Sequence, residues 1–298
     1  MRYTLSLLLA SLLALPAQAD VPRVVADLPA TGSLVALVMG DLGQPQVLLD
    51  KGADAHSFQL RPSQAATLAD AGLIVWIGPE MTPWLDRTLD GPAAGVRQRQ
   101  LLSVPGTILL TATEPDNDAA AADHDHGETD PHAWLSPINA ALWITVIATD
   151  LADLDPANAT TYAANAAKAQ TDLTALDTEI AALLHPAQGV PIVVAHDAYG
   201  YFASHYGLTL AGTIADGDAA APGAAHLRSL QALLVESPIC VFPEVNYDPK
   251  LAALLIEGTP ARLGTALDPE GAAIANGPGL YAEILRGLAT AIAGCVRQ

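Results

Sequence analysis

The sequence is poor in basic residues, in aromatic residues and in cysteine. Its 13 Lys and Arg residues are outnumbered by 32 Asp and Glu residues, which gives a formal net charge of −19 at pH 7. This charge argues against nucleic acid and anionic membranes as partners, whereas it attracts cations. Long hydrophobic runs are also absent beyond the N-terminal segment, so we expect no later membrane-spanning helix. The positive mean hydropathy of +0.31 comes largely from alanine.

Residues 1–19 have the pattern of a secretory signal peptide. A basic start is followed by a short apolar run and then by the small-residue triplet Ala17-Gln18-Ala19. Cleavage after Ala19 and the lack of a nearby cysteine predict a protein that is free in the periplasm and carries no lipid anchor. The alternative interpretation is a buried N-terminal helix.

The chain contains two cysteines, Cys240 and Cys295. In an exported protein, two thiols most simply form one disulfide, which here would join the last helix to a strand. The alternative is that both cysteines are metal ligands.

Short apolar runs that alternate with helical segments predict the fold class. Residues 73–77, 191–195 and 239–242 are typical of buried parallel strands. We expect a helix from Ser33, another capped by Ser63, and a strand at 262–267. The alternation indicates an α/β fold with mostly parallel sheets.

An alanine-rich helical segment divides the chain into two parts. We expect it to begin at Asp155, a capping residue, and to end at His185 before Pro186. The predicted domains are therefore an N-terminal α/β lobe at 20–154, a linker helix at 155–185 and a C-terminal α/β lobe at 186–298. The alternative for the long helix is an ordinary core helix.

Four residues that bind metal well lie far apart in the sequence, each beside a turn-forming residue or past an apolar strand. They are His56, His132, His196 and Asp268. Three imidazoles and one carboxylate suit zinc. Because no single helix or loop contains all four, they would meet only between two lobes. Unrelated histidines and an ordinary Asp-Pro turn at Asp268 are the alternatives.

Residues 114–130 form an acidic segment without apolar periodicity. It contains His124 and His126, which predict a weak secondary zinc site on a mobile loop. The alternative is a solvated linker.

Several other residues are candidates for supporting roles. Glu80 and Glu244 either orient an imidazole or are solvated acids. Trp134 and Tyr199 are expected to pack around the site. We assign no metal-binding role to His185, His205 or His226.

Four motifs carry a resemblance to a known family. The chain resembles the zinc-binding components of bacterial ABC importers, the cluster A-I solute-binding proteins. The matching segments are Gly52-Ala53-Asp54-Ala55-His56, Asp130-Pro131-His132-Ala133-Trp134-Leu135, His196-Asp197-Ala198-Tyr199-Gly200-Tyr201-Phe202 and Leu267-Asp268-Pro269.

The resemblance implies two βα-sandwich lobes joined by a long rigid linker helix, with the metal site in the interlobe cleft. It places the ligands at His56, His132, His196 and Asp268, with a water as the alternative to Asp268. His196 stands where manganese-binding members usually carry Glu, which favours zinc. The implied partners are Zn²⁺ as transported ligand, a membrane ABC permease and a periplasmic zinc chaperone, and the implied state is a monomer.

The rival hypothesis is an exported zinc hydrolase. His124-Asp125-His126 superficially resembles a metallo-β-lactamase motif, but Glu128 stands where that motif needs Asp. A metalloprotease H-E-x-x-H motif is also absent from the sequence. Four protein ligands would leave no position for a catalytic water, so we expect no enzyme. A manganese-binding or adhesin-like protein of the same fold stays open as an alternative.

Overall fold

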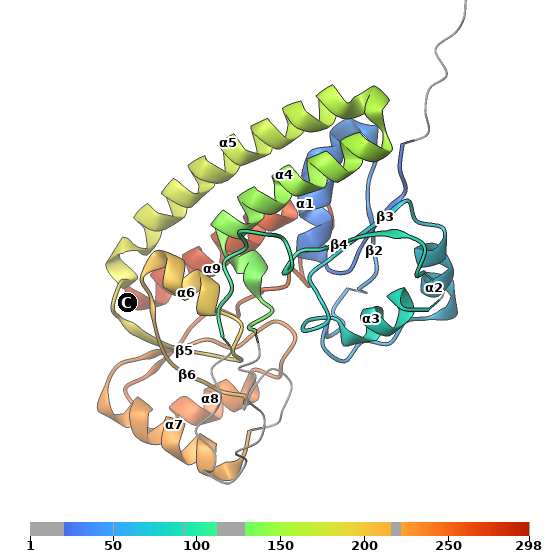
Figure 1. Ribbon diagram of the computed structural model, residues 1–298. Coiled ribbons are helices and arrows are strands. Elements are labelled where there is room, and N and C mark those ends of the chain that lie inside the picture. The colour runs from blue at the N-terminus through green and yellow to red at the C-terminus, as the bar shows by residue number, and fades with distance from the viewer. Residues whose placement is uncertain (1–20, 50, 92, 112–128, 216–221, 298) are drawn as a thin grey trace, which may run out of the picture.

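The computed structural model describes residues 21–49, 51–91, 93–111, 129–215 and 222–297. The predicted signal peptide and most of the acidic loop lie outside these ranges. Within them the chain forms two α/β lobes, each built on a four-stranded parallel sheet (Figure 1). The prediction of an α/β fold with parallel sheets is therefore confirmed.

The first lobe has the strand order β2-β1-β3-β4. Its central strands β1 and β3 are short, apolar and buried, as parallel strands covered on both faces must be. The elements are β1 (Val24–Ala26), α1 (Pro29–Met39), the 3-10 helix η1 (Gly40–Leu42), β2 (Gln46–Val47), α2 (Pro62–Ala69), β3 (Leu73–Trp76), α3 (Pro83–Leu89) and β4 (Arg97–Gln100).

The second lobe repeats this arrangement with the order β6-β5-β7-β8. In both sheets the first strand lies between the second and the third, which creates a topological switch point at its carboxyl end, where open α/β sheets bind ligands. The elements are β5 (Pro191–Val194), α6 (Gly200–Tyr206), β6 (Thr209–Thr213), α7 (Ala224–Glu236), β7 (Cys240–Val241), α8 (Lys250–Ile256), β8 (Arg262–Leu263) and α9 (Leu280–Val296).

A layer of long helices joins the two lobes, as Figure 1 shows for α5 along one side of the molecule. Along the chain, the elements between β4 and β5 are η2 (Ala133–Leu135), α4 (Pro137–Leu154), η3 (Pro156–Asn158), α5 (Ala159–Leu184) and η4 (His185–Ala187). The 26 residues of α5 span about 39 Å at ~1.5 Å per residue. One apolar stripe of α5 is buried, with the three- and four-residue spacing of an amphipathic helix: Tyr162, Ala166, Ala169, Leu173, Leu176, Ile180 and Leu184.

One continuous hydrophobic core extends through both lobes. Helices α1, α4, α5 and α9 pack against one another, and their buried residues belong to the same cluster as Val24 of the first sheet and Cys240 of the second. Hydrogen bonds also cross between the lobes. The backbone N–H of Tyr281 donates to Oγ of Ser33 at 3.0 Å, and its hydroxyl donates to the carbonyl oxygen of Trp134 at 2.7 Å. These contacts link the two lobes.

Several local predictions need correction. Helix α1 begins at Pro29 and not at Ser33, because Pro suits the first helical turn. Arg61, not Ser63, is the N-cap of α2, and the side chain of Gln64 accepts from the backbone N–H of Arg61. The carboxylate of Asp155 does not cap the helix by accepting from a backbone N–H group. It accepts from the side-chain amide of Asn158 and the hydroxyl of Tyr162 instead.

Two further differences concern polarity. Strand β4 was not predicted because its sequence, Arg-Gln-Arg-Gln, lacks apolar residues. Arg97 and Arg99 reach the buried carboxylate of Asp150 on α4 at 2.6 to 2.8 Å.

In the described residues, α4 has the length and hydropathy of a helix that could cross a membrane, contrary to our expectation. Half of that helix is buried inside the protein, as in a core helix.

Candidate metal centre

Polar side chains gather where the strands of both sheets end. Asp27 follows β1, His196 follows β5 by two residues, Glu244 follows β7, and Asp268 follows β8. His56 and His132 lie on the connections from β2 to α2 and from β4 to η2. The fold therefore brings residues from distant parts of the sequence to one region between the lobes.

The three predicted histidine ligands lie close together. The ring centroids of His56 and His132 are 5.5 Å apart, and those of His132 and His196 are 5.3 Å apart. Two imidazoles that share one tetrahedral zinc, with Zn–N distances of ~2.0–2.1 Å, have centroids about 5.2 Å apart. His132 lies between the other two rings, so its distance to each neighbour fits a shared ion.

The cluster is not yet a finished ligand sphere. Among residues 21–297 as far as they are described, no three His, Cys, Asp or Glu side chains form a ready-made metal site. The two centroid distances, 5.3 and 5.5 Å, exceed the value of about 5.2 Å for a shared ion by about 0.1 and 0.3 Å. The ring spacing is therefore close to that of imidazoles on one ion.

His132 is fully buried and oriented by Asp130. Oδ1 of Asp130 lies 2.8 Å from Nδ1 of His132 and also accepts from its backbone N–H at 2.9 Å. Burial raises the pKa of Asp130 to about 7, while the hydrogen bond from His132 and the nearby His196 and His56 oppose the shift. When Asp130 is ionised it only accepts, so Nδ1 carries the proton and Nε2 is the metal-binding nitrogen.

His196 has an equivalent partner from another strand. Its Nδ1 lies 2.8 Å from Oε1 of Glu244, and both side chains are buried. The hydroxyl of Tyr199 donates to the same Oε1 at 2.9 Å. Burial, followed by the charge of Glu244, raises the pKa of Tyr199 well above its ordinary value, so the phenol stays a donor. Glu244 thus has the orienting role that the sequence suggested as one of two options.

His56 is half-buried on a tight turn. The carboxylate of Asp54 accepts from the backbone N–H of His56 at 2.8 Å and from the hydroxyl of Ser57 at 2.9 Å. The indole N–H of Trp84 donates to the carbonyl oxygen of Ala55 at 2.6 Å, which ties the turn to α3. These bonds position the turn that carries His56.

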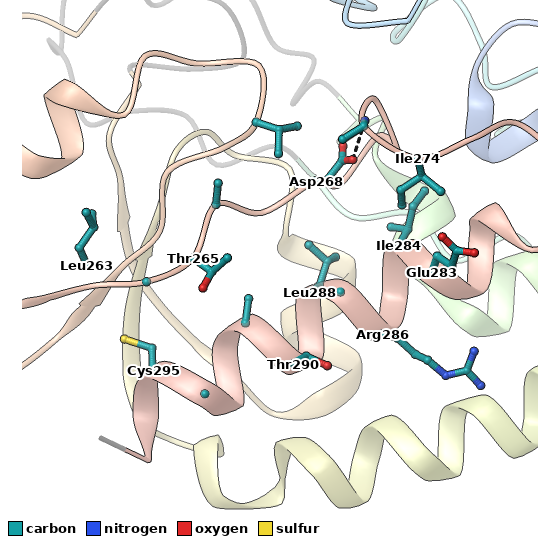
Figure 2. A pocket seen from close by; sticks show the side chains of 17 residues that line it. Leu263, Thr265, Asp268, Ile274, Glu283, Ile284, Arg286, Leu288, Thr290 and Cys295 are labelled. Carbon is teal, nitrogen blue, oxygen red and sulfur yellow. Dashed lines mark hydrogen bonds between the residues drawn. The ribbon is translucent and has the colours of Figure 1, made fainter.

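Asp268 lies next to Glu244 because the chain pairs Glu244 with Leu267 in a parallel bridge. Its two carboxylate oxygens accept from the backbone N–H groups of Ala272 at 2.8 Å and Ala273 at 2.9 Å. Asp268 therefore stabilises the turn that follows it, whatever else it binds. Figure 2 shows this side chain at one end of a cavity.

The cavity in Figure 2 is not the histidine cluster. It has a volume of about 630 Å³ and lies between α9 and the segment that follows β8, with Leu263, Thr265 and Arg286 among its lining residues. Its walls are largely apolar, and none of the three histidines lines it. The cavity and the histidine cluster are therefore separate features of the molecule.

The remaining candidates are distributed as follows. Glu80 is exposed, with its Oε2 beside Gly78. His205 pairs with Asp177 at 2.7 Å, and His226 contacts the carbonyl oxygen of Thr213, so neither is part of the cluster.

Three further predictions concern other histidines and an aromatic neighbour. His185 is exposed and directly follows the end of α5, where the sequence placed it. The ring of Trp134 lies 5.3 Å from that of His132, so Trp134 packs beside the site as expected. His124 and His126 lie outside the described residues, and the secondary site stays a prediction.

The two cysteines form a disulfide, as predicted. Cys240 of β7 and Cys295 of α9 are bonded, with Cα atoms 6.2 Å apart. The alternative, a pair of cysteine metal ligands, is therefore wrong. The bond joins the last helix to the second sheet.

Sequence reasoning missed two carboxylates at this site. Asp130 was counted in the acidic segment and in the motif around His132, but no role at the histidine was assigned to it, although its place two residues before His132 was a usable signal. Glu270 is 8% exposed and lies in the turn after Asp268, where no pattern distinguishes it from a surface acid.

The fold and the cluster together define a class: two-lobed α/β binding proteins with imidazoles collected between the lobes. Within this class the chain belongs to the ZnuA family, described as the periplasmic component A of a zinc-uptake complex, whose model matches residues 24–295.

Curated relatives agree with this family. The chain is 48% identical over 325 residues to the high-affinity zinc uptake system protein ZnuA of Paracoccus denitrificans, with 98% of each chain covered. It is 32% identical to the protein of the same name from Yersinia pestis, covering 97% of this chain and 95% of that one.

Solved structures give the same result. A crystal structure of ZnuA matches with a TM-score of 0.78 and 26% identity, covering 93% of this chain and 99% of that one. A zinc-bound ZnuA deletion mutant matches with a TM-score of 0.75 and 27% identity over 93% and 98%. The predicted family and the two-lobed fold with its linking helix are confirmed.

Proposed function

We propose that this protein captures Zn²⁺ in the periplasm and delivers it to a membrane ABC permease, with no chemical change to the ion. The observation that carries the proposal is the pair of buried carboxylates at the histidine cluster. Asp130 and Glu244 each lie 2.8 Å from Nδ1 of a histidine, which directs Nε2 of both rings to the metal. Membership in a family described as a zinc-uptake component supports the same role.

We infer that the ligands are His56 and His132 from the first lobe and His196 and Asp268 from the second. Three imidazoles suit zinc better than manganese or calcium, which prefer oxygen donors. The ring distances of 5.3 and 5.5 Å support a shared ion. Four protein ligands would close the site to a catalytic water, which fits transport and not hydrolysis.

The proposal includes the export and the partners. Residues 1–19 act as a cleaved signal peptide, and the mature protein is a free monomer without a lipid anchor. Its partners are Zn²⁺, an ABC permease and a periplasmic zinc chaperone. Relatives named as zinc uptake system proteins support the permease as partner.

The test is a chelator competition titration of the purified protein with Zn²⁺. His56→Ala, His132→Ala and His196→Ala should each weaken binding by orders of magnitude, because each removes an inferred ligand. His205→Ala is the matched control, since His205 pairs with Asp177 away from the cluster. Circular dichroism should show that all four variants are folded.

The outcomes separate the hypotheses. One tightly bound zinc per chain, lost in the three cluster variants alone, supports the site. Equal losses in His205→Ala and His196→Ala would contradict the assignment. Turnover of a hydrolase substrate by the zinc-loaded protein would contradict a purely transporting role.

A further inference from the structure

Glu270 is a buried acid whose role the fold does not explain. Its side chain is 8% exposed, and its Oε2 has no hydrogen-bond partner among the described residues. A buried carboxylate oxygen without a partner loses its hydration and gains nothing in return, which is costly. Such a group calls for a cation or a hydrogen-bond donor.

The backbone around Glu270 is fixed on both sides. The indole N–H of Trp134 donates to the carbonyl oxygen of Pro269 at 2.9 Å, and the ring of Trp134 lies 5.3 Å from that of His132. On the other side, Gly271 has a φ of +77°, a conformation that favours glycine, and packs against α9. The backbone of the turn that carries Glu270 is therefore held against Trp134, whose ring neighbours that of His132.

The charges that act on Glu270 belong to the same site. His196 lies close enough to Glu270 to act on its carboxylate electrostatically. Glu244, Asp54 and Asp268 also act on it. Glu270 further lines a small cavity of about 90 Å³ together with Gly52 and Ala53, which lead to His56. It thus lies among residues that surround the histidine cluster from both lobes.

Asp268 and Glu270 differ in what they already do. Both oxygens of Asp268 accept backbone N–H groups of its own turn, whereas Glu270 makes no such contact in the described residues. Asp268 has a structural task even without an ion. Glu270 has a task only if it binds one.

We propose that Glu270 is a second carboxylate ligand of the ion bound by the three histidines, on the same turn as Asp268. This inference rests on the proposed zinc-binding function. Glu270 would add a hard oxygen donor to the imidazoles, and the turn at 268–270 would then supply two carboxylates to the site.

The experiment compares Glu270→Gln with Glu257→Gln, a matched change at an exposed acid at the end of α8. Zinc affinity by chelator competition should fall at least ~10-fold in Glu270→Gln, as losses at metal sites typically do. The visible absorption of the Co²⁺-loaded protein should change in band position and intensity, because a carboxylate ligand is lost. Glu257→Gln should match the parent protein in both.

A third measurement distinguishes a ligand from a structural residue. Without metal, Glu270→Gln should unfold at the same temperature as the parent protein or a higher one, because a buried unpartnered charge is removed. Unchanged affinity with an unchanged Co²⁺ spectrum would overturn the proposal, and so would a variant that is unfolded or less stable without metal. If the parent protein binds no zinc, or His132→Ala binds it equally well, the proposed function fails instead.

Discussion

His196 and Glu244 are separated by 48 positions in the sequence, yet Nδ1 of His196 lies 2.8 Å from Oε1 of Glu244 and both side chains are buried. The pairing of β5 with β7 causes this contact, because each residue follows one of these neighbouring strands. The carboxylate orients the imidazole before any ion arrives. The site is therefore preorganised in the second lobe by sheet topology.

Glu244→Ala should weaken zinc binding by about 10- to 100-fold, since loss of the group that orients a metal-binding imidazole typically costs this much. Glu244→Gln should have a smaller effect, because its amide oxygen still accepts the proton of Nδ1. Chelator competition measures both. Exposed Glu236→Gln at the end of α7 is the control. Wild-type affinity in Glu244→Ala would show that the contact has no role in binding.

Trp134→Phe tests the link between the lobes. The variant leaves the buried carbonyl oxygen of Pro269 without its donor, which should cost roughly 1–3 kcal/mol of unfolding free energy. The turn that carries Asp268 would then be less firmly held beside His132, so zinc affinity should fall by about 10-fold. Urea unfolding and chelator competition give the two values.

Trp143→Phe is the matched control for this experiment. Trp143 is also fully buried, and its indole N–H donates to Oγ1 of Thr107 at 3.0 Å. It should lose comparable stability and keep the parent zinc affinity. If both variants lose affinity equally, the effect follows stability and not the position of the turn.

Replacing both cysteines by serine should lower stability without touching the metal site. The disulfide links residues 55 positions apart, for which the chain-entropy model gives at most about 4 kcal/mol. Urea unfolding of Cys240→Ser/Cys295→Ser should show a reduced free energy with unchanged zinc stoichiometry. Loss of zinc from a folded double variant would contradict the separation of the two features.

Asp27 should make stability depend on pH. Its carboxylate is fully buried and accepts from the backbone N–H groups of Leu28 at 2.7 Å and Ile77 at 2.8 Å. Burial nevertheless raises its pKa from 3.8 to about 6. The folded protein therefore binds this proton more tightly than the unfolded chain, so the unfolding free energy should increase as pH falls from about 6 to about 4.

Asp27→Asn isolates this effect because asparagine does not titrate. The unfolding free energy of the parent protein minus that of the variant should increase by about 2 kcal/mol between pH 6 and pH 4, and should be constant above about pH 7. Urea titrations at several pH values measure the difference. A difference that is flat across this window would rule out the raised pKa.

Deleting residues 118–127 tests the acidic segment, which lies outside the described residues. A weak second zinc-binding event in calorimetry should disappear, while the tight event should persist because the three clustered histidines are retained. Loss of the tight event would mean that the segment supplies a primary ligand.

The sequence by itself determined the features that rest on local pattern. Apolar runs such as 73–76 became buried strands, and the alanine-rich segment became α5, because burial and helix propensity act over a few residues. The identities of His56, His132 and His196 as candidate donors followed from residue type and from their motifs. The disulfide followed from having only two cysteines in an exported chain.

Only the tertiary structure decided which groups face the histidines. Strand pairing brings Glu244 to His196, and the contact of Trp134 with Pro269 brings the turn with Glu270 towards His132. Glu80, which was an equal candidate to Glu244, lies exposed beside Gly78. The sequence does not show whether a carboxylate is solvated or buried, because this depends on which distant residues pack around it. The role of the carboxylate depends on the same packing.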